Sequence, residues 1–233
     1  MYFQWKPVST LREVRYNEER WRLLRRLRGR AIDVMAGLDE QGLSTILHGS
    51  VARGDVNERS DVDVLVPYQI PSFRVEHALA KLGCDPLSRE VIQATPFSVI
   101  KAYITLDETT TVSFPLTRMT VRERGFYRFG GEITLDGLRR GIRVPGVSKG
   151  LTLIKPTPYG HDEGPVIGHE SEVAKVVGVD LDVVRERVRV LTRRRQVGRT
   201  GVFLKQEVPQ GKTVEQVVKE LVRGRRLLLR GAI

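Results

Sequence analysis

The chain has 233 residues, of which 40% are hydrophobic and 29% charged, a balance typical of a soluble globular protein with one or two domains. No apolar run approaches the roughly 18 residues that a membrane span needs, and no basic start precedes an apolar core. We therefore expect neither a membrane segment nor a signal peptide. The single cysteine, Cys84, excludes an intramolecular disulfide and a cysteine-built zinc site, and it fits a reducing cytoplasm.

The net charge of +11 is unevenly distributed along the chain. Residues 1–117 hold 15 basic and 15 acidic side chains, whereas residues 118–233 hold 24 basic and 13 acidic ones. A basic C-terminal half predicts a polyanionic partner, most simply a nucleic acid, although a solvated arginine-rich surface explains the charge equally well. Asparagine occurs only at positions 17 and 57, a composition that hints at a thermophilic source.

In the first half, apolar periodicity predicts a small mixed α/β unit over residues 1–118. The long helix carries an apolar stripe at steps of three and four, and the last two strands flank Asp107-Glu108 as a hairpin. In chain order the predicted elements are a helix over 10–38, a strand over 43–49, a helix start at Ser50, a strand over 61–68, a helix over 73–83, and strands over 97–106 and 109–117. Residues 119–168, rich in glycine, proline and short β-prone pieces, are predicted to form a β-rich connector.

Residues 48–66, HGSVARGDVNERSDVDVLV, combine a Gly-Ser turn with two aspartates. Asp61 and Asp63 point the same way on a strand, where a solvated face is the simpler explanation. However, adjacent carboxylates repel each other unless a cation lies between them, and Mg²⁺ prefers one or two carboxylates together with substrate phosphates. Gly49 allows a ligand to approach the backbone, Ser50 adds a hydroxyl donor, and Arg53 follows one turn later. This pattern predicts a site for a metal ion and a polyphosphate.

The motif G-S-V-A-R-G-D followed by S-D-V-D resembles the DNA polymerase beta-type nucleotidyltransferase superfamily, in particular its small prokaryotic and archaeal members, over about residues 10–117. The resemblance implies an α/β (α+β) nucleotidyltransferase fold, a small mixed sheet flanked by helices. It implies that Gly49 and Ser50 bind the phosphates of an NTP, with help from Arg53. It also implies that Asp61 and Asp63 are catalytic and bind Mg²⁺ or Mn²⁺ while a hydroxyl attacks the α-phosphate.

The superfamily normally adds a third carboxylate on a later strand beside the first two. The matching strand here, TTTVSFPLT, carries no acid, and Ser113 occupies the expected position. Serine neither shares the charge of a metal ion nor accepts a proton near neutral pH as a carboxylate does. The acids left as candidates are Asp107 and Glu108 at the hairpin tip, and Glu132, Asp136, Asp162 and Glu163 in the connector.

Residues 169–233 resemble a winged helix-turn-helix domain. Two predicted helices meet at Gly178, and QVGRTGVFLKQEV is predicted to form the two strands and the turn of the wing. A final helix begins near Thr213 and either packs on this domain or forms a dimer contact. The exposed arginines that we expect to bind nucleic acid are Arg185, Arg189, Arg193, Arg194 and Arg199.

Two functions fit this organisation of 1–118, 119–168 and 169–233. One is a cytoplasmic, metal-dependent nucleotidyltransferase that transfers NMP from an NTP to a hydroxyl acceptor and binds DNA or RNA through its basic domain. The other is a DNA-binding regulator whose degenerate transferase domain senses a nucleotide. The third carboxylate distinguishes the two functions, because the transferase needs it and the regulator does not. A homodimer is compatible with either function.

Overall fold

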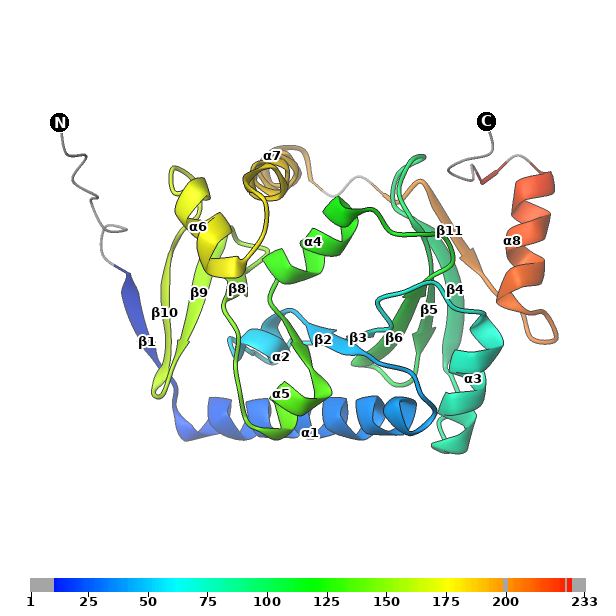
Figure 1. Cartoon of the computed structure of the whole chain (residues 1–233), viewed down its shortest axis with the longest axis horizontal. Helices are drawn as coiled ribbons and strands as arrows, with labels where there is room; N and C mark the ends of the chain where they lie inside the picture. Colours follow the sequence, from blue (N-terminus) through cyan, green and yellow to red (C-terminus); the bar gives the residue numbers. More distant parts are fainter. Residues whose placement is uncertain (1–10, 199–200, 225, 228–233) are drawn as a thin grey trace.

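A computed structural model of the chain describes residues 11–198, 201–224 and 226–227. Within them lie a seven-stranded sheet, with strand order β11-β4-β5-β6-β3-β2-β7, and a four-stranded sheet, with strand order β1-β10-β9-β8. Figure 1 shows the two sheets standing side by side over the long helix α1, with α4, α6 and α7 above. No helix of the described residues is both long enough and apolar enough to cross a membrane.

The helices and strands have the following bounds. The helices are α1 (Glu18–Glu40), α2 (Ser50–Arg53), α3 (Ser72–Lys81), α4 (Val121–Phe129), α5 (Leu135–Arg139), α6 (Glu170–Val177), α7 (Leu181–Val197) and α8 (Val214–Arg223). The strands are β1 (Arg12–Arg15), β2 (Ile46–His48), β3 (Val62–Leu65), β4 (Ser88–Gln93), β5 (Ile100–Thr105), β6 (Thr110–Pro115), β7 (Glu132–Thr134), β8 (Gly146–Val147), β9 (Thr152–Thr157), β10 (Gly160–Pro165) and β11 (Leu204–Glu207).

The predicted long helix forms, but it begins later than the apolar pattern suggested. Residues 12–15 form β1 and pair with β10. Asn17 then caps α1, because its side-chain oxygen accepts a hydrogen bond from the Arg20 amide at 2.9 Å. The predicted apolar stripe of α1 is buried against the seven-stranded sheet. We call this cluster the sheet core, and its largest fully buried members include Met35, Leu38, Leu47, Leu79, Ile100, Ile104 and Phe114.

The predicted hairpin between β5 and β6 is confirmed, and β6 then lies parallel to β3. Alternate residues of β3 point to opposite faces of the sheet. Val62 and Val64 belong to the sheet core, so Asp63 and Leu65 point to the other face. There Leu65 packs with Ile46 and with Tyr127 of α4. The aspartate motif therefore lies on the face that α1 does not cover.

The second part of the chain builds a separate core between the four-stranded sheet, α6 and α7. Gly178 joins these two helices with φ of 68°, a left-handed conformation that glycine adopts without strain. The predicted pair of helices and its turn therefore form. This second core consists of Phe129, Val147, Leu151, Leu153, Val166, Val173, Ala174, Val177, Val183, Val184 and Leu191.

The predicted winged helix is not confirmed. Residues 196 and 197, expected to begin the first wing strand, continue α7, and the predicted turn falls partly on residues 199–200, outside the described residues. The second expected wing strand becomes β11, which pairs antiparallel with β4 of the seven-stranded sheet. The physical reason is burial, because Leu204 and Val208 join the sheet core together with α8. The segment from β11 to α8 thus completes the first sheet.

Glu215 of α8 secures this arrangement by capping a helix from the first half of the chain. Its carboxylate accepts hydrogen bonds from the Ser72 amide at 2.6 Å and from the Ser72 hydroxyl at 2.8 Å. Pro71, at the N-cap position of α3, supplies no side-chain cap. Burial disfavours the charged carboxylate, but the hydrogen bonds from Ser72 outweigh burial and hold the pKa of Glu215 below its ordinary value.

We predict that Glu215→Ala lowers the free energy of unfolding by about 1 kcal/mol at pH 7, because α3 loses its cap. The folded-state pKa is depressed, so this contribution is complete above the unfolded pKa of about 4.3 and disappears as the pH falls through the folded pKa. Urea denaturation between pH 3 and pH 7 measures both effects. Glu220→Ala on the same helix is the control. It removes an exposed ion pair with Lys212, which precedes the helix, and should change stability by less than about 0.5 kcal/mol. Equal effects of the two variants would contradict the capping role.

Candidate functional site

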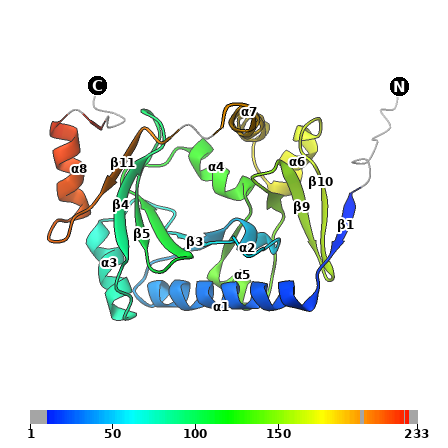
Figure 2. The same cartoon turned by 180° about the vertical axis from the view of Figure 1, so that it is seen from behind.

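The Gly-Ser turn lies where β2 ends and the short helix α2 begins. Gly49 has φ of 87° and ψ of −150°, which an L-residue with a side chain rarely adopts. Its amide donates to the carbonyl of Gly131 at 2.9 Å, so the turn is fastened to the chain just before β7. The Ser50 hydroxyl donates to the Ser60 hydroxyl at 3.1 Å, next to the first aspartate. Figure 2 shows α2 between the two sheets and above α1.

The two aspartates lie at the start of β3, with Asp61 exposed and Asp63 half-buried. Burial raises the pKa of both carboxyl groups, and the charge of Asp63 raises the pKa of Asp61 further. The ammonium of Lys149 opposes these effects at both aspartates, and Lys101 also lowers the pKa of Asp63. The raised pKa values mean that this pair of negative charges would be stabilised by an additional cation.

The neighbouring strand supplies no third carboxylate. The register between β3 and β6 places Thr111 beside Asp63 and Ser113 beside Leu65. Ser113, which we expected at the position of the third carboxylate beside the aspartates, therefore lies two residues beyond Asp63 along the strand. Ser113 is buried, and its hydroxyl donates to the carbonyl of Val64 at 3.5 Å. Among the residues that the structure describes, no three His, Cys, Asp or Glu side chains form a group that could hold a metal ion.

The other candidate acids are engaged elsewhere, apart from Glu108, which is exposed at the hairpin tip. Glu132 comes nearest in register, because β7 places it opposite His48, which in turn lies opposite Asp63. Its carboxylate, however, forms ion pairs with Arg124 and Arg128. The remaining pairs are Asp107 with Arg30, Asp136 with Arg140, Asp162 with Tyr159, and Glu163 with Arg12 and His161.

The Arg53 side chain is buried and bonded to protein partners. Its guanidinium forms an ion pair with Asp55 at 2.8 Å, and the exposed fractions of the two side chains are only 6% and 12%. It also donates to the carbonyl of Gly130 at 2.5 Å and to that of Val147 at 3.5 Å. The structure therefore gives Arg53 a structural role next to the site, and its contact with phosphate stays a prediction.

His48 packs against Tyr127, with ring centroids 4.9 Å apart. Burial, reinforced by the charges of Lys101, Arg53 and Lys149, lowers the pKa of His48 to about 3. The imidazole is therefore neutral at physiological pH, as expected for a packing residue.

Sequence reasoning missed two lysines, Lys101 and Lys149, that lie close enough to influence the aspartates. Lys101 of β5 donates to the Tyr127 hydroxyl at 2.9 Å, and its ammonium lies 5.3 Å from the centroid of the Tyr103 ring. A lysine inside an alternating β-rich run was a signal that one face of this strand lines a polar site. Lys149 follows β8, and no local pattern links it to the aspartates.

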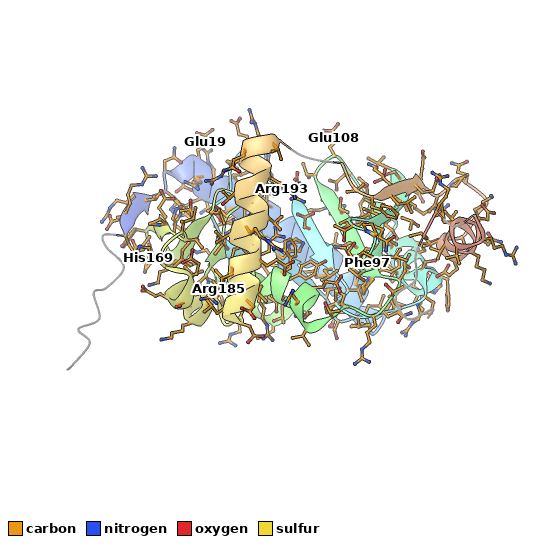
Figure 3. The ribbon with its side chains drawn as sticks, turned by 90° about the horizontal axis from the view of Figure 1, so that it is seen from above. Glu19, Phe97, Glu108, His169, Arg185 and Arg193 are labelled. Atoms are coloured by element: carbon orange, nitrogen blue, oxygen red, sulfur yellow. The ribbon has the colours of Figure 1, made fainter. Side chains whose placement is uncertain are left out.

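The predicted nucleic-acid-binding arginines lie on α7, apart from Arg199, which is outside the described residues. Arg185, Arg189, Arg193 and Arg194 are exposed, and the first three follow at steps of four, so they lie along one side of the helix. Figure 3 shows α7 crossing the upper face of the molecule, with Arg185 and Arg193 near opposite ends of its exposed side. The apolar side of α7 is buried in the second core.

A cavity of about 1060 Å³ lies between α4, α6 and the start of α7, and its lining includes Val121, Arg124, Arg128 and Lys175. Neither the Gly-Ser turn nor the aspartates line it. The predicted nucleotide site is thus a different feature of the molecule, built on β2, β3 and the turn between β2 and α2.

Comparison with known proteins supports this assignment for the first half of the chain. Residues 30–122 match the family model described as "Nucleotidyltransferase domain". The matched segment contains the Gly-Ser turn, both aspartates and Ser113. The searches of curated proteins and of solved structures gave no match. The mixed α/β architecture agrees with a nucleotidyltransferase fold, and the predicted resemblance is confirmed for this segment.

We predict that Arg53→Met lowers the free energy of unfolding by about 3 kcal/mol, because it leaves the buried carboxylate of Asp55 without its cation. Denaturation in urea at pH 7 provides the measurement. Arg25→Met is the matched control, since Arg25 forms an exposed ion pair with Glu18 on α1 and its removal should cost at most about 0.5 kcal/mol. If Arg53→Met were as mild as this control, the structural role of Arg53 would be wrong.

Proposed function

We propose that the protein is a metal-dependent nucleotidyltransferase that binds an NTP and transfers NMP to a hydroxyl acceptor. The observation that carries this proposal is the position of the paired aspartates beside the Gly-Ser turn, inside the segment that matches a nucleotidyltransferase domain. Gly49 exposes backbone without a side chain, and Ser50 contributes a hydroxyl donor. Asp61 and Asp63 supply two carboxylates on the same face of β3.

The aspartates fit Mg²⁺ or Mn²⁺ by their chemistry. Both are oxygen donors, and both have raised pKa values that a cation would lower. A bound divalent ion would stabilise the charge that develops on the phosphate during transfer. In this proposal the chain itself holds the ion through Asp61 and Asp63 and holds the polyphosphate through the Gly-Ser turn.

One observation favours the alternative function, a regulator that binds the nucleotide without transferring it. Thr111 and Ser113 stand on the strand beside the aspartates, so that strand supplies no carboxylate for the acceptor hydroxyl. Nucleotide binding needs only the two aspartates and the phosphate contacts, whereas rapid transfer also benefits from activation of the hydroxyl. The two functions therefore share a binding site and differ in the rate of chemistry.

We predict that the protein transfers label from an α-labelled NTP to an acceptor in Mg²⁺ or Mn²⁺, and that Asp61→Asn/Asp63→Asn abolishes the transfer. Each of the four NTPs is tested with RNA, DNA and protein acceptors, and products are separated by electrophoresis. The double variant keeps the shape of the site but removes both negative charges. Binding of the NTP without transfer above the level of the double variant would reject the enzyme and support the regulator.

We also propose that α7 binds nucleic acid. Its exposed arginines form a row that neutralises phosphates, and the excess positive charge of the chain lies in this half. Because the apolar side of α7 is buried in the second core, only the exposed side of the helix offers these contacts. The row suits backbone contacts, which position a strand without reading its sequence.

We predict that Arg185→Gln/Arg189→Gln/Arg193→Gln weakens binding of labelled single-stranded and duplex oligonucleotides. The slope of log affinity against log salt should become shallower by about 0.7 to 0.9 for each phosphate that the variant no longer neutralises. Fluorescence anisotropy at several salt concentrations measures both quantities. Arg22→Gln/Arg25→Gln/Arg26→Gln removes the same charge from exposed positions of α1 and serves as the control. An equal weakening in this control would show that net charge, and not α7, governs binding.

A further inference from the structure

The turn between β8 and β9 is tightly built. The amide of Ser148 donates to the carbonyl of Thr152 at 2.9 Å, and the amide of Leu151 donates to the carbonyl of Ser148 at 3.0 Å. Leu151 has φ of 54°, and among the described residues no other non-glycine residue has a positive φ. Its side chain is buried in the second core, which holds this disfavoured conformation in place. The packing of Leu151 therefore fixes the backbone of the turn that carries Lys149.

The same turn is attached to the Gly-Ser turn through the backbone around it. Arg53 donates both to Gly130, beside the residue that accepts the Gly49 amide, and to Val147, two residues before Lys149. Gly146 packs so closely that a Cβ atom on it would lie 2.5 Å from the amide nitrogen of Gly131. The Gly-Ser turn and the Lys149 turn are thus held together in one unit.

Lys149 differs from the other two cations of this site in having no partner among the described residues. Arg53 is paired with Asp55, and Lys101 donates to Tyr127. Lys149 is exposed, and in the part of the chain that the structure describes its ammonium forms no hydrogen bond or ion pair. Its turn is nevertheless held against the Gly-Ser turn through Arg53 and Gly146, beside the start of β3. A cation close to the aspartates but not paired with them is available to a ligand.

We propose that Lys149 binds the polyphosphate of the nucleotide whose metal ion is held by Asp61 and Asp63. This inference rests on the nucleotide binding of the proposed function and does not require transfer. An NTP with one Mg²⁺ carries a net negative charge, and the two aspartates add two more. A lysine ammonium supplies three donors and a compensating positive charge. Lys149 comes from residues beyond the 30–122 match, so the site draws on both parts of the chain.

A role for Lys149 only as a positive charge that balances the aspartates explains its position less well. Such a lysine would be expected within ion-pair distance of a carboxylate, and none of the described ion pairs includes it. The strained turn and its attachment to Arg53 also hold the backbone that carries this lysine beside the Gly-Ser turn. A phosphate between Lys149 and the metal ion would satisfy both charges.

The test compares Lys149→Met with Lys149→Arg and with Lys219→Met, which removes an exposed lysine of α8. Isothermal titration in MgCl₂ measures binding of each of the four NTPs, of inorganic tripolyphosphate and of the corresponding nucleosides. We expect Lys149→Met to weaken NTP and tripolyphosphate binding by about tenfold, the effect of removing one charge-assisted hydrogen bond. Lys149→Arg should retain most of the affinity, Lys219→Met all of it, and nucleoside binding should not respond. Circular dichroism and thermal unfolding verify that each variant is folded.

The opposing outcomes are distinct. If the wild-type protein binds NTPs and Lys149→Met binds them equally well, Lys149 is not a phosphate ligand and the proposed function stands. If Lys149→Met loses affinity for a single-stranded oligonucleotide but not for NTPs or tripolyphosphate, Lys149 contacts nucleic acid and the inference is wrong. If the wild-type protein binds no NTP at all, the inference and the proposed function both fail.

Discussion

The arrangement of the site depends on the ion pair and hydrogen bonds that the buried guanidinium of Arg53 forms. This guanidinium is neutralised by Asp55 and donates to carbonyls of both sheet regions, at Gly130 before β7 and at Val147 in β8. The seven-stranded and four-stranded sheets therefore meet around one charged group. Because a buried cation without its partners is costly, the relative placement of the two sheets near the Gly-Ser turn is strongly determined. The sequence motif placed Arg53 near the phosphates, and the structure shows that it supports the surrounding backbone.

The charges around the aspartates explain why the site suits a metal-bound anion. Two carboxylates with raised pKa values lie near two lysines, one of which is engaged with a tyrosine while the other, among the described residues, has no partner. Such an arrangement is incomplete without a ligand that carries both signs of charge. A divalent ion with a polyphosphate has this property. On the face of the aspartates, the neighbouring strand contributes the hydroxyl groups of Thr111 and Ser113 and no carboxylate for the acceptor hydroxyl.

Local patterns in the sequence identified the elements that depend on neighbours in the chain. The alternation around Asp63, the hairpin at Asp107-Glu108, the stripe of α1 and the turn at Gly178 are all confirmed. Features that depend on contacts between residues far apart in the sequence could not be predicted from local patterns. The strand β11 has the composition of a wing strand, and only the apolar surface beside β4 decides where it pairs. Likewise, Lys149 lies near the aspartates because Arg53 and Gly146 join two turns that are far apart in sequence.

The pairing of β11 with β4 has a consequence for how the protein is made. An uncovered edge strand exposes unpaired backbone groups that can pair with other chains, and β4 has no covering strand on this side until β11 arrives. During synthesis the first half of the chain would emerge with its helices and the inner strands of its sheet, but with the β4 edge open. Only when residues 204–223 have left the ribosome can β11 pair with β4 and α8 pack into the sheet core. Pairing with β11 therefore shields the backbone groups of β4, and the seven-stranded sheet is complete only once residues 204–207 are available.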